Sequence, residues 1–149
     1  MTASTPSIDS TSRADLVALM LRLTLGAVLL AHGLLKLVVF GLPGTAAFFA
    51  SIGFPGWTAY AVAPFETIVG AALIAGLGSR AFAVAALPVL AGAALVHAGN
   101  GWLFSNAGGG WEFPAVLLAL SLAVAVAGDG AWTVRRLLPG GPAPRIARA

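Results

Sequence analysis

The chain has 149 residues, of which 59% are hydrophobic and only 9% are charged, and its mean hydropathy is +0.96, values that exclude an ordinary water-soluble domain. Because it contains no cysteine, the chain cannot hold an iron–sulfur cluster through thiolates or form a disulfide. Its formal charge of +3 comes from basic residues beside apolar segments, which indicates orientation in a lipid bilayer and not nucleic-acid binding.

The apolar residues fall into four separate blocks, which predict transmembrane helices and not the alternating strands of a membrane barrel. Each block is close to the roughly 20 residues that cross a bilayer core, although the last two are marginally short. The sequence therefore predicts an all-α membrane protein, a four-transmembrane-helix bundle within residues 15–138, flanked by disordered tails at 1–14 and 139–149. The helices are expected at about 15–39, 58–77, 81–98 and 113–127.

The first apolar block is read as a retained helix. It runs from about Leu16 to Phe40, which is too long for the apolar core of a signal peptide, and no convincing small-residue cleavage site follows. The connection after it contains Pro43, the apolar stretch from Thr45 to Ile52, and a run of small and aromatic residues ending at Trp57. Such a connection predicts a short interfacial or re-entrant segment between the first and second helices.

The distribution of arginine predicts the orientation of the bundle. Arg13 precedes the first helix, Arg80 lies between the second and third, and Arg135, Arg136, Arg145 and Arg148 follow the fourth. The remaining two loops contain neither Lys nor Arg. Positive charge near helix ends favours the cytoplasmic side, so we expect a multi-pass protein of the cell membrane with both termini in the cytoplasm.

Five ionisable residues from all four predicted helices should lie near the outer face. At roughly 1.5 Å per residue, Lys36 lies roughly 6 Å below the outer edge, and His32 and Glu66 each roughly 12 Å below it. His97 closes the third helix and Glu112 opens the fourth, so both belong at the outer mouth. Intramembrane ionisable residues usually serve a function, and their clustering predicts a pocket here.

One face of the first helix is shared by Arg22, Gly33 and the two cluster residues His32 and Lys36. This face must point into the bundle, because a charge facing lipid costs several kcal/mol and because glycine lets another helix approach closely. Arg22 lies roughly 15 Å deeper than His32. We take Arg22, Gly33, His97 and Glu112 as candidate ligand-binding residues.

The chemistry that these residues suit best is quinone binding. His32 and Glu66 could exchange the protons that accompany quinone redox chemistry, while Lys36 could hydrogen-bond a carbonyl oxygen. These three residues are the catalytic candidates, and the apolar bundle would accept the isoprenoid tail. A rival hypothesis is a non-enzymatic scaffold that anchors a partner, in which Lys36 and Glu66 form only a structural polar network.

Haem binding and transport would use the same residues differently. His32 and His97 could ligate a haem from opposite faces, although His97 is shallower by most of two turns, which disfavours that geometry. No metal site is predicted, because no local spacing such as Glu-x-x-His supports one. A small transport subunit is also open, because Arg22 lies deeper in the membrane than the cluster at the outer face.

The order of the motifs adds a family resemblance. From Leu16 to about Trp132 the chain resembles the DoxX family of small four-helix membrane proteins. The motifs that carry the resemblance are Arg22-x-x-x-Gly26, His32-Gly33-x-x-Lys36-Leu37, Phe48-Phe49, Gly53-Phe54-Pro55, Glu66-x-x-x-Gly70, Gly76-Leu77-Gly78-Ser79-Arg80, His97, Gly109-Gly110-Trp111-Glu112 and Gly128-Asp129-Gly130.

This resemblance implies a role in redox metabolism. The family is named for subunits of a thiosulfate:quinone oxidoreductase, and some members are linked to redox and sulfur homeostasis beside soluble enzymes. We therefore expect a quinone-binding subunit of a membrane oxidoreductase, acting with a protein partner in a redox complex or as a homo-oligomer and not as an enzyme alone. The resemblance implies no agreed set of catalytic residues, and the absence of cysteine argues against direct sulfur transfer by this subunit.

Overall fold

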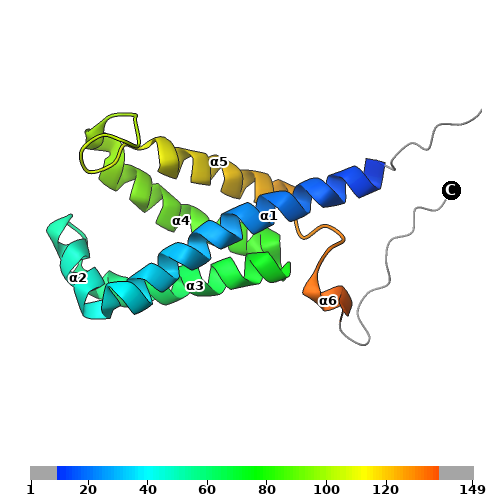
Figure 1. Ribbon diagram of the computed structural model, residues 1–149, viewed down its shortest axis with the longest axis horizontal. Helices are drawn as coiled ribbons and strands as arrows, with labels where there is room; N and C mark the ends of the chain where they lie inside the picture. The colour runs from blue at the N-terminus through cyan, green and yellow to red at the C-terminus, as the bar shows by residue number, and fades with distance from the viewer. Residues whose placement is uncertain (1–9, 138–149) are drawn as a thin grey trace, which may run out of the picture.

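The computed structural model describes residues 10–137, and within them the chain is helical with no strand, which confirms the all-α prediction (Figure 1). Most of the two tails predicted to be disordered, residues 1–9 and 138–149, lies outside the described residues. The helices are α1 (Ser10–Leu34), α2 (Gly41–Ser51), α3 (Ala59–Ala75), α4 (Ser79–His97), α5 (Glu112–Ala127) and α6 (Val134–Leu137). A π-helical segment, Leu35–Val39, extends α1, and 3₁₀ turns occupy Gly56–Thr58 and Ala98–Asn100.

Helix α1 begins at Ser10, ahead of the expected start near Asp15. The sequence pattern locates only the part of a helix that lies in hydrocarbon, whereas backbone hydrogen bonding can continue through polar residues into the headgroup region. The connection between α1 and α3 contains the helix α2, where a short interfacial or re-entrant segment was expected. Gly41, with φ of +70°, lies at the junction between α1 and α2.

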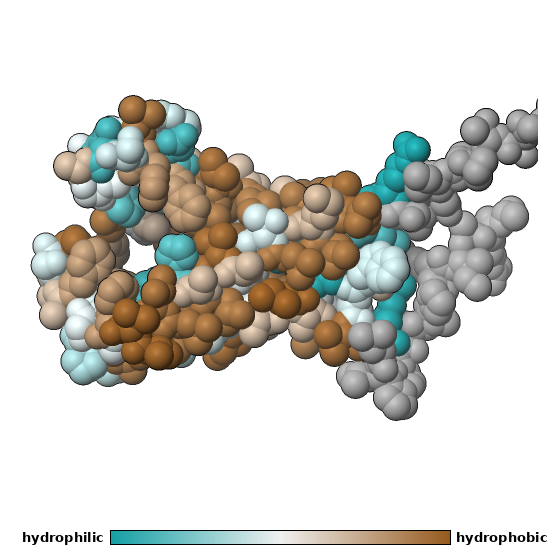
Figure 2. Space-filling view, viewed as in Figure 1, coloured by the Kyte–Doolittle hydropathy of each residue, from teal (hydrophilic) through white to brown (hydrophobic). Residues whose placement is uncertain are grey.

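Three helical stretches of the described chain are long and apolar enough to cross a membrane: Arg13–Val39, Gly56–Ala75 and Ser79–Asn100. Helix α5 is also apolar but has only 16 residues. Large apolar side chains point outward from these helices, for example Val38, Leu95 and Val126, each about three-quarters exposed. Figure 2 shows apolar residues around the middle of the molecule and hydrophilic residues toward its two ends. A soluble monomer rarely exposes so much apolar surface, so this is a membrane protein.

Close packing of α1 on α3 depends on glycine. A Cβ atom on Gly26 would lie 2.9 Å from the Gly70 carbonyl oxygen, and one on Gly70 would lie 2.7 Å from the Gly26 carbonyl oxygen. The two backbones therefore touch, as the glycines on the predicted face of the first helix led us to expect. The apolar core extends from this contact to α4 and α5 and includes Leu25, Leu29, Val69, Leu73, Ala83, Ala86, Leu90, Leu117 and Val124.

A tight turn joins α3 to α4 and makes them antiparallel neighbours. Gly76 and Gly78 in this turn have φ of +69° and +66°, a region that favours glycine. The backbone N–H of Ser79, at the start of α4, donates to Oδ1 of Asp129 at 2.6 Å. Asp129 therefore caps α4 from the segment after α5, which gives this aspartate of the Gly-Asp-Gly motif a structural role.

The two ends of the bundle differ in charge. The start of α1, the α3–α4 turn and α6 lie at one end, and α2 and the α4–α5 connection lie at the opposite end (Figure 1). Arg13, Arg80 and Arg136 belong to the first, which we call the basic end. We call the second the α2 end. Lys36 lies toward the α2 end, in the π-helical segment just before α2.

Candidate functional site

A cavity of about 500 Å³ lies toward the α2 end of the bundle, and we call it the main cavity. Residues of α1, α2, α3, α4 and α5 all line it. Its walls are mostly apolar, with aromatic side chains from Phe48, Phe49, Phe54 and Phe113. Its polar and ionisable side chains are His32, Lys36, Thr58, Glu66 and His97. An apolar cavity with a few convergent polar groups is the usual form of a small-molecule site.

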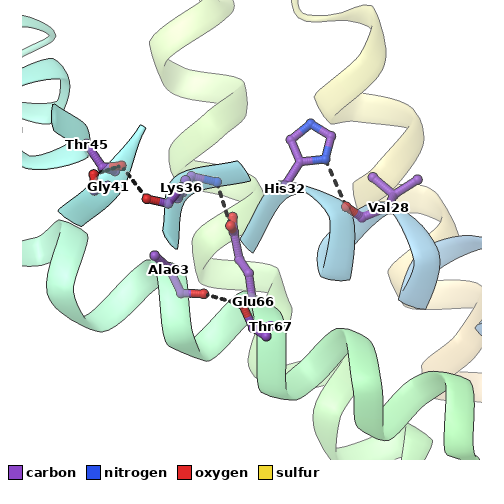
Figure 3. Close-up of polar contacts among 8 residues, drawn as sticks. All are labelled: Val28, His32, Lys36, Gly41, Thr45, Ala63, Glu66 and Thr67. Carbon is purple, nitrogen blue, oxygen red and sulfur yellow. Dashed lines mark hydrogen bonds and ion pairs between the residues drawn. The ribbon is translucent and has the colours of Figure 1, made fainter. Parts of the chain in front are cut away.

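Lys36 and Glu66 form an ion pair between the end of α1 and α3, with Nζ 2.5 Å from Oε2 (Figure 3). The side chains are 18% and 8% exposed, so both charges are largely removed from solvent. The sequence left open whether Glu66 is paired, and the structure pairs it with Lys36. In a low-dielectric region each charge needs its counter-ion, because an unpaired buried charge is strongly destabilising.

The backbone at Lys36 is π-helical. This form is rare in proteins overall, and where it occurs it is often at a functional site. The hydroxyl of Thr45 on α2 lies 3.0 Å from the Lys36 carbonyl oxygen and 2.9 Å from that of Gly41, and it donates to one of them at a time. Thr45 is only 3% exposed. Sequence reasoning missed this contact, because a threonine in an apolar helix gives no signal beyond its hydroxyl. Thr45 therefore ties α2 to the backbone that carries Lys36.

His32 is held by two neighbours. Its Nδ1 lies 2.8 Å from the Val28 carbonyl oxygen one turn earlier in α1 (Figure 3), and its ring stacks on Phe113 of α5 with centroids 6.0 Å apart. A carbonyl oxygen can only accept a hydrogen bond, so Nδ1 carries the proton. In the neutral imidazole, Nε2 is then an acceptor.

His97, at the end of α4, is held by the glycine-rich connection. Its Nδ1 lies 3.0 Å from the Gly108 carbonyl oxygen and 3.1 Å from that of Gly109. The Asn100 side-chain amide donates to the same two carbonyls, at 3.1 and 2.9 Å. Nδ1 of His97 therefore also carries the proton, and its Nε2 is an acceptor in the neutral ring.

Glu112, at the start of α5, lies outside the main cavity. One of its carboxylate oxygens accepts a hydrogen bond from the Phe104 backbone N–H at 3.1 Å. It lines a second cavity of about 500 Å³ together with His32, Phe104, Phe113 and Val116. We call this the side cavity. Because Phe104 and Val116 are exposed, the side cavity reaches the surface of the bundle, and His32 and Phe113 belong to both cavities.

Arg22 and Gly33 line neither the main cavity nor the side cavity. The Arg22 guanidinium donates to the carbonyl oxygens of Leu73, at 2.9 Å, and Ile74, at 2.5 Å, in the last turn of α3, and also to that of Trp132. It thereby joins α1, α3 and the segment after α5 near the basic end. Gly33 is buried where α1 meets α3, and a Cβ atom there would lie 2.6 Å from the Thr67 backbone nitrogen. Its position is explained by packing.

Within residues 10–137, no group of three or more His, Asp or Glu side chains is arranged to hold a metal ion. His32 and His97 line the same cavity from different helices, while Glu112 faces the side cavity. The structure thus brings together four of the seven residues singled out in the sequence: His32, Lys36, Glu66 and His97.

Comparison with known proteins gives a family and one relative. The DoxX family matches the chain over residues 17–99, which is more than half of its length. A protein of Bacillus subtilis (strain 168) named "Putative oxidoreductase CatD" is 39% identical over 66 residues, which are 44% of this chain and 48% of that protein. The match therefore spans about half the length of this curated relative. No solved structure matches the chain.

Proposed function

Because this chain belongs to the DoxX family of membrane proteins, we propose that its main cavity binds a quinone and that it serves as the quinone-binding subunit of a membrane oxidoreductase linked to sulfur or redox metabolism. One observation carries the proposal: the Lys36–Glu66 pair and two histidines line an apolar cavity of about 500 Å³. The oxidoreductase name of the Bacillus relative supports the redox part.

The residues present fit a quinone. A bound quinone supplies two-electron, two-proton redox chemistry. Lys36 uses one N–H for Glu66 and keeps two that can donate to a carbonyl oxygen on the ring. Glu66 and His32 offer sites that take or release protons at the cavity wall. The phenylalanines of the wall exclude water and pack against the ring.

The side cavity supports access from the bilayer. It lies between α1 and α5, shares the lining residues His32 and Phe113 with the main cavity, and reaches the surface at Phe104 and Val116. An isoprenoid tail is apolar and remains in lipid, so a bound quinone needs an apolar path between helices. We propose that the side cavity forms the outer part of such a path.

We assign the basic end and both termini to the cytoplasm, and the main cavity to the outer half of the cell membrane, since positive charges near helix ends favour the cytoplasmic side. We also propose that α5 is the fourth span. Its 16 residues extend about 24 Å, and a bilayer can thin locally around a short helix. We further propose that a protein partner supplies the electrons, since a chain without cysteine cannot pass them through a dithiol or a thiolate-bound iron–sulfur cluster.

Analysis of the co-purified ligand tests this proposal. The full chain is purified in mild detergent, extracted with organic solvent, and the extract is analysed by chromatography with absorbance and mass detection. We expect a near-stoichiometric quinone in the wild type and in Val126→Ala, a matched lipid-facing change, and a reduced amount in His32→Ala. An extract without quinone, even when quinone is present during purification, would contradict the proposal; haem would support bis-histidine ligation instead.

A second candidate is a non-enzymatic scaffold that anchors a partner. The observation that favours it is the Lys36–Glu66 pair, which already satisfies both charges between α1 and α3 without a ligand. Breaking this pair lowers stability on either hypothesis, so a scaffold predicts that Glu66→Gln lowers partner recovery in proportion to the stability that it loses. The quinone proposal predicts that the fraction of Glu66→Gln protein that still folds binds less quinone than the wild type.

A further inference from the structure

We infer that the main cavity is built to hold the reduced form of its ligand, a hydroquinone whose hydroxyl groups donate hydrogen bonds to His32 and His97. This inference rests on the proposed function, since it concerns the same cavity, and it specifies which redox form the cavity prefers. The preference follows from which polar groups at the cavity wall can donate a hydrogen bond and which can accept one.

Both histidines offer acceptors. Nδ1 of His32 donates to the Val28 carbonyl, and Nδ1 of His97 donates to a carbonyl of Gly108 or Gly109. Within the described part of the chain, no hydrogen-bond partner contacts either Nε2 atom. In the neutral ring this nitrogen carries a lone pair and no proton, so it can only accept.

The remaining polar groups at the wall add to this excess of acceptors. The Thr58 hydroxyl gives its hydrogen to the Pro55 carbonyl at 2.7 Å, which leaves its oxygen as an acceptor. Glu66 accepts from Lys36, and its carboxylate has further lone pairs. Among the described lining residues, only Lys36 keeps spare N–H groups on its side chain.

The two redox forms of a quinone meet this wall differently. The carbonyl oxygens of the oxidised form only accept, so they can pair with Lys36 but with neither imidazole Nε2 atom. Each hydroxyl of the reduced form donates to an acceptor and can also accept from Lys36. A ligand form that lacks donors forgoes the hydrogen bonds to these acceptors and binds less tightly.

Hydrogen bonds to backbone carbonyls fix the orientation of both imidazole rings, so the acceptors stay acceptors. His32 is fixed from α1 and by the Phe113 ring of α5, and His97 is fixed by the connection that follows α4. Neither ring can turn its N–H toward the ligand without breaking a hydrogen bond to a carbonyl. We therefore expect the reduced form to bind at least about tenfold more tightly than the oxidised form.

Binding of one compound in its two redox states tests the inference. A decyl-substituted 1,4-benzoquinone and its hydroquinone are each titrated into the purified full chain in detergent, without oxygen, by isothermal titration calorimetry. The variants His97→Asn and His97→Gln distinguish the role of Nδ1 as a donor from the role of Nε2 as an acceptor. Asn can keep the donor to the glycine carbonyls but removes the acceptor at the Nε2 position, whereas Gln presents its amide at that position.

We expect the preference for the hydroquinone to fall by about tenfold in His97→Asn and to persist in His97→Gln and in the lipid-facing control Val126→Ala. Equal binding of the two forms, tighter binding of the quinone, or an unchanged preference in His97→Asn would overturn this inference and leave the proposed function standing. Failure of both forms to bind the wild type would instead overturn the proposed function itself.

Discussion

Lys36 and Glu66 meet between the end of α1 and the middle of α3, with Nζ 2.5 Å from Oε2, at the wall of the main cavity. The pair lies where α1 passes into the π-helical segment Leu35–Val39, shortly before α2 begins at Gly41. One contact therefore serves two purposes: it neutralises two buried charges, and it holds a cation and a carboxylate beside an apolar space.

Removing one partner of this pair should be more harmful than removing both. Glu66→Gln leaves the Lys36 ammonium without its counter-ion, so we expect a loss of about 3–5 kcal/mol in unfolding free energy. The double change Lys36→Met with Glu66→Met should recover much of that stability but not quinone binding. Thermal unfolding in detergent, followed by circular dichroism, measures the first effect. Equal stability of the single and double variants would contradict it.

Thr45 should position Lys36 without touching the ligand. Thr45→Val keeps the side-chain shape but removes the hydroxyl that bonds the Lys36 or Gly41 carbonyl, which should cost about 1 kcal/mol of stability. Quinone affinity should fall severalfold because the Lys36 backbone loses its tie to α2. The control is Thr24→Val, whose exposed hydroxyl bonds Met20 within α1. Equal effects of the two changes on affinity would rule out a positioning role.

Arg22 should matter for folding and not for the ligand. Its side chain is 2% exposed and bonds carbonyls of Leu73, Ile74 and Trp132 near the basic end, far along α1 from His32. Arg22→Met should therefore lower stability by about 3 kcal/mol or more, since three acceptors lose a charged donor. Protein that still folds should bind quinone with unchanged affinity. Loss of binding in fully folded Arg22→Met would place Arg22 in the site after all.

The orientation can be checked by labelling single cysteines, because the native chain has none. Ser105 lies in the exposed α4–α5 connection, and Leu77 is 42% exposed in the α3–α4 turn. With a membrane-impermeant maleimide on intact cells, Ser105→Cys should be labelled and Leu77→Cys should be labelled only after lysis. Labelling of Leu77→Cys alone from outside would invert the proposed topology.

Sequence reasoning reached much of the architecture because lipid imposes simple rules. Long apolar stretches predicted four spans, three of which the structure shows as helices long and apolar enough to cross a membrane. Glycine on the predicted inner face of α1 predicted the close approach of another helix, which is α3. The depth calculated from residue spacing along each helix also predicted that Lys36, His32 and Glu66 lie in one layer near the outer face. The count of four spans stays a prediction, since α5 is shorter than an average bilayer requires.

Several contacts depend on backbone groups that sequence does not reveal. Arg22 bonds carbonyl oxygens 51, 52 and 110 residues away, and nothing in residue type identifies a carbonyl as a partner. For the same reason the fixed ring of His97, held by Gly108 and Gly109, could not be foreseen. The π-helical turn at Lys36 carries no marker such as proline in its five residues.

Photoaffinity labelling tests most directly whether the main cavity binds a quinone. Membranes that contain the full chain are irradiated with a photoreactive quinone analogue, and the labelled peptides are mapped by mass spectrometry. We expect label on peptides carrying His32, Phe113 or His97, and protection of these positions by excess unlabelled quinone. Label confined to lipid-facing residues such as Val126 or Leu95, or label that excess quinone does not reduce, would contradict quinone binding in the main cavity.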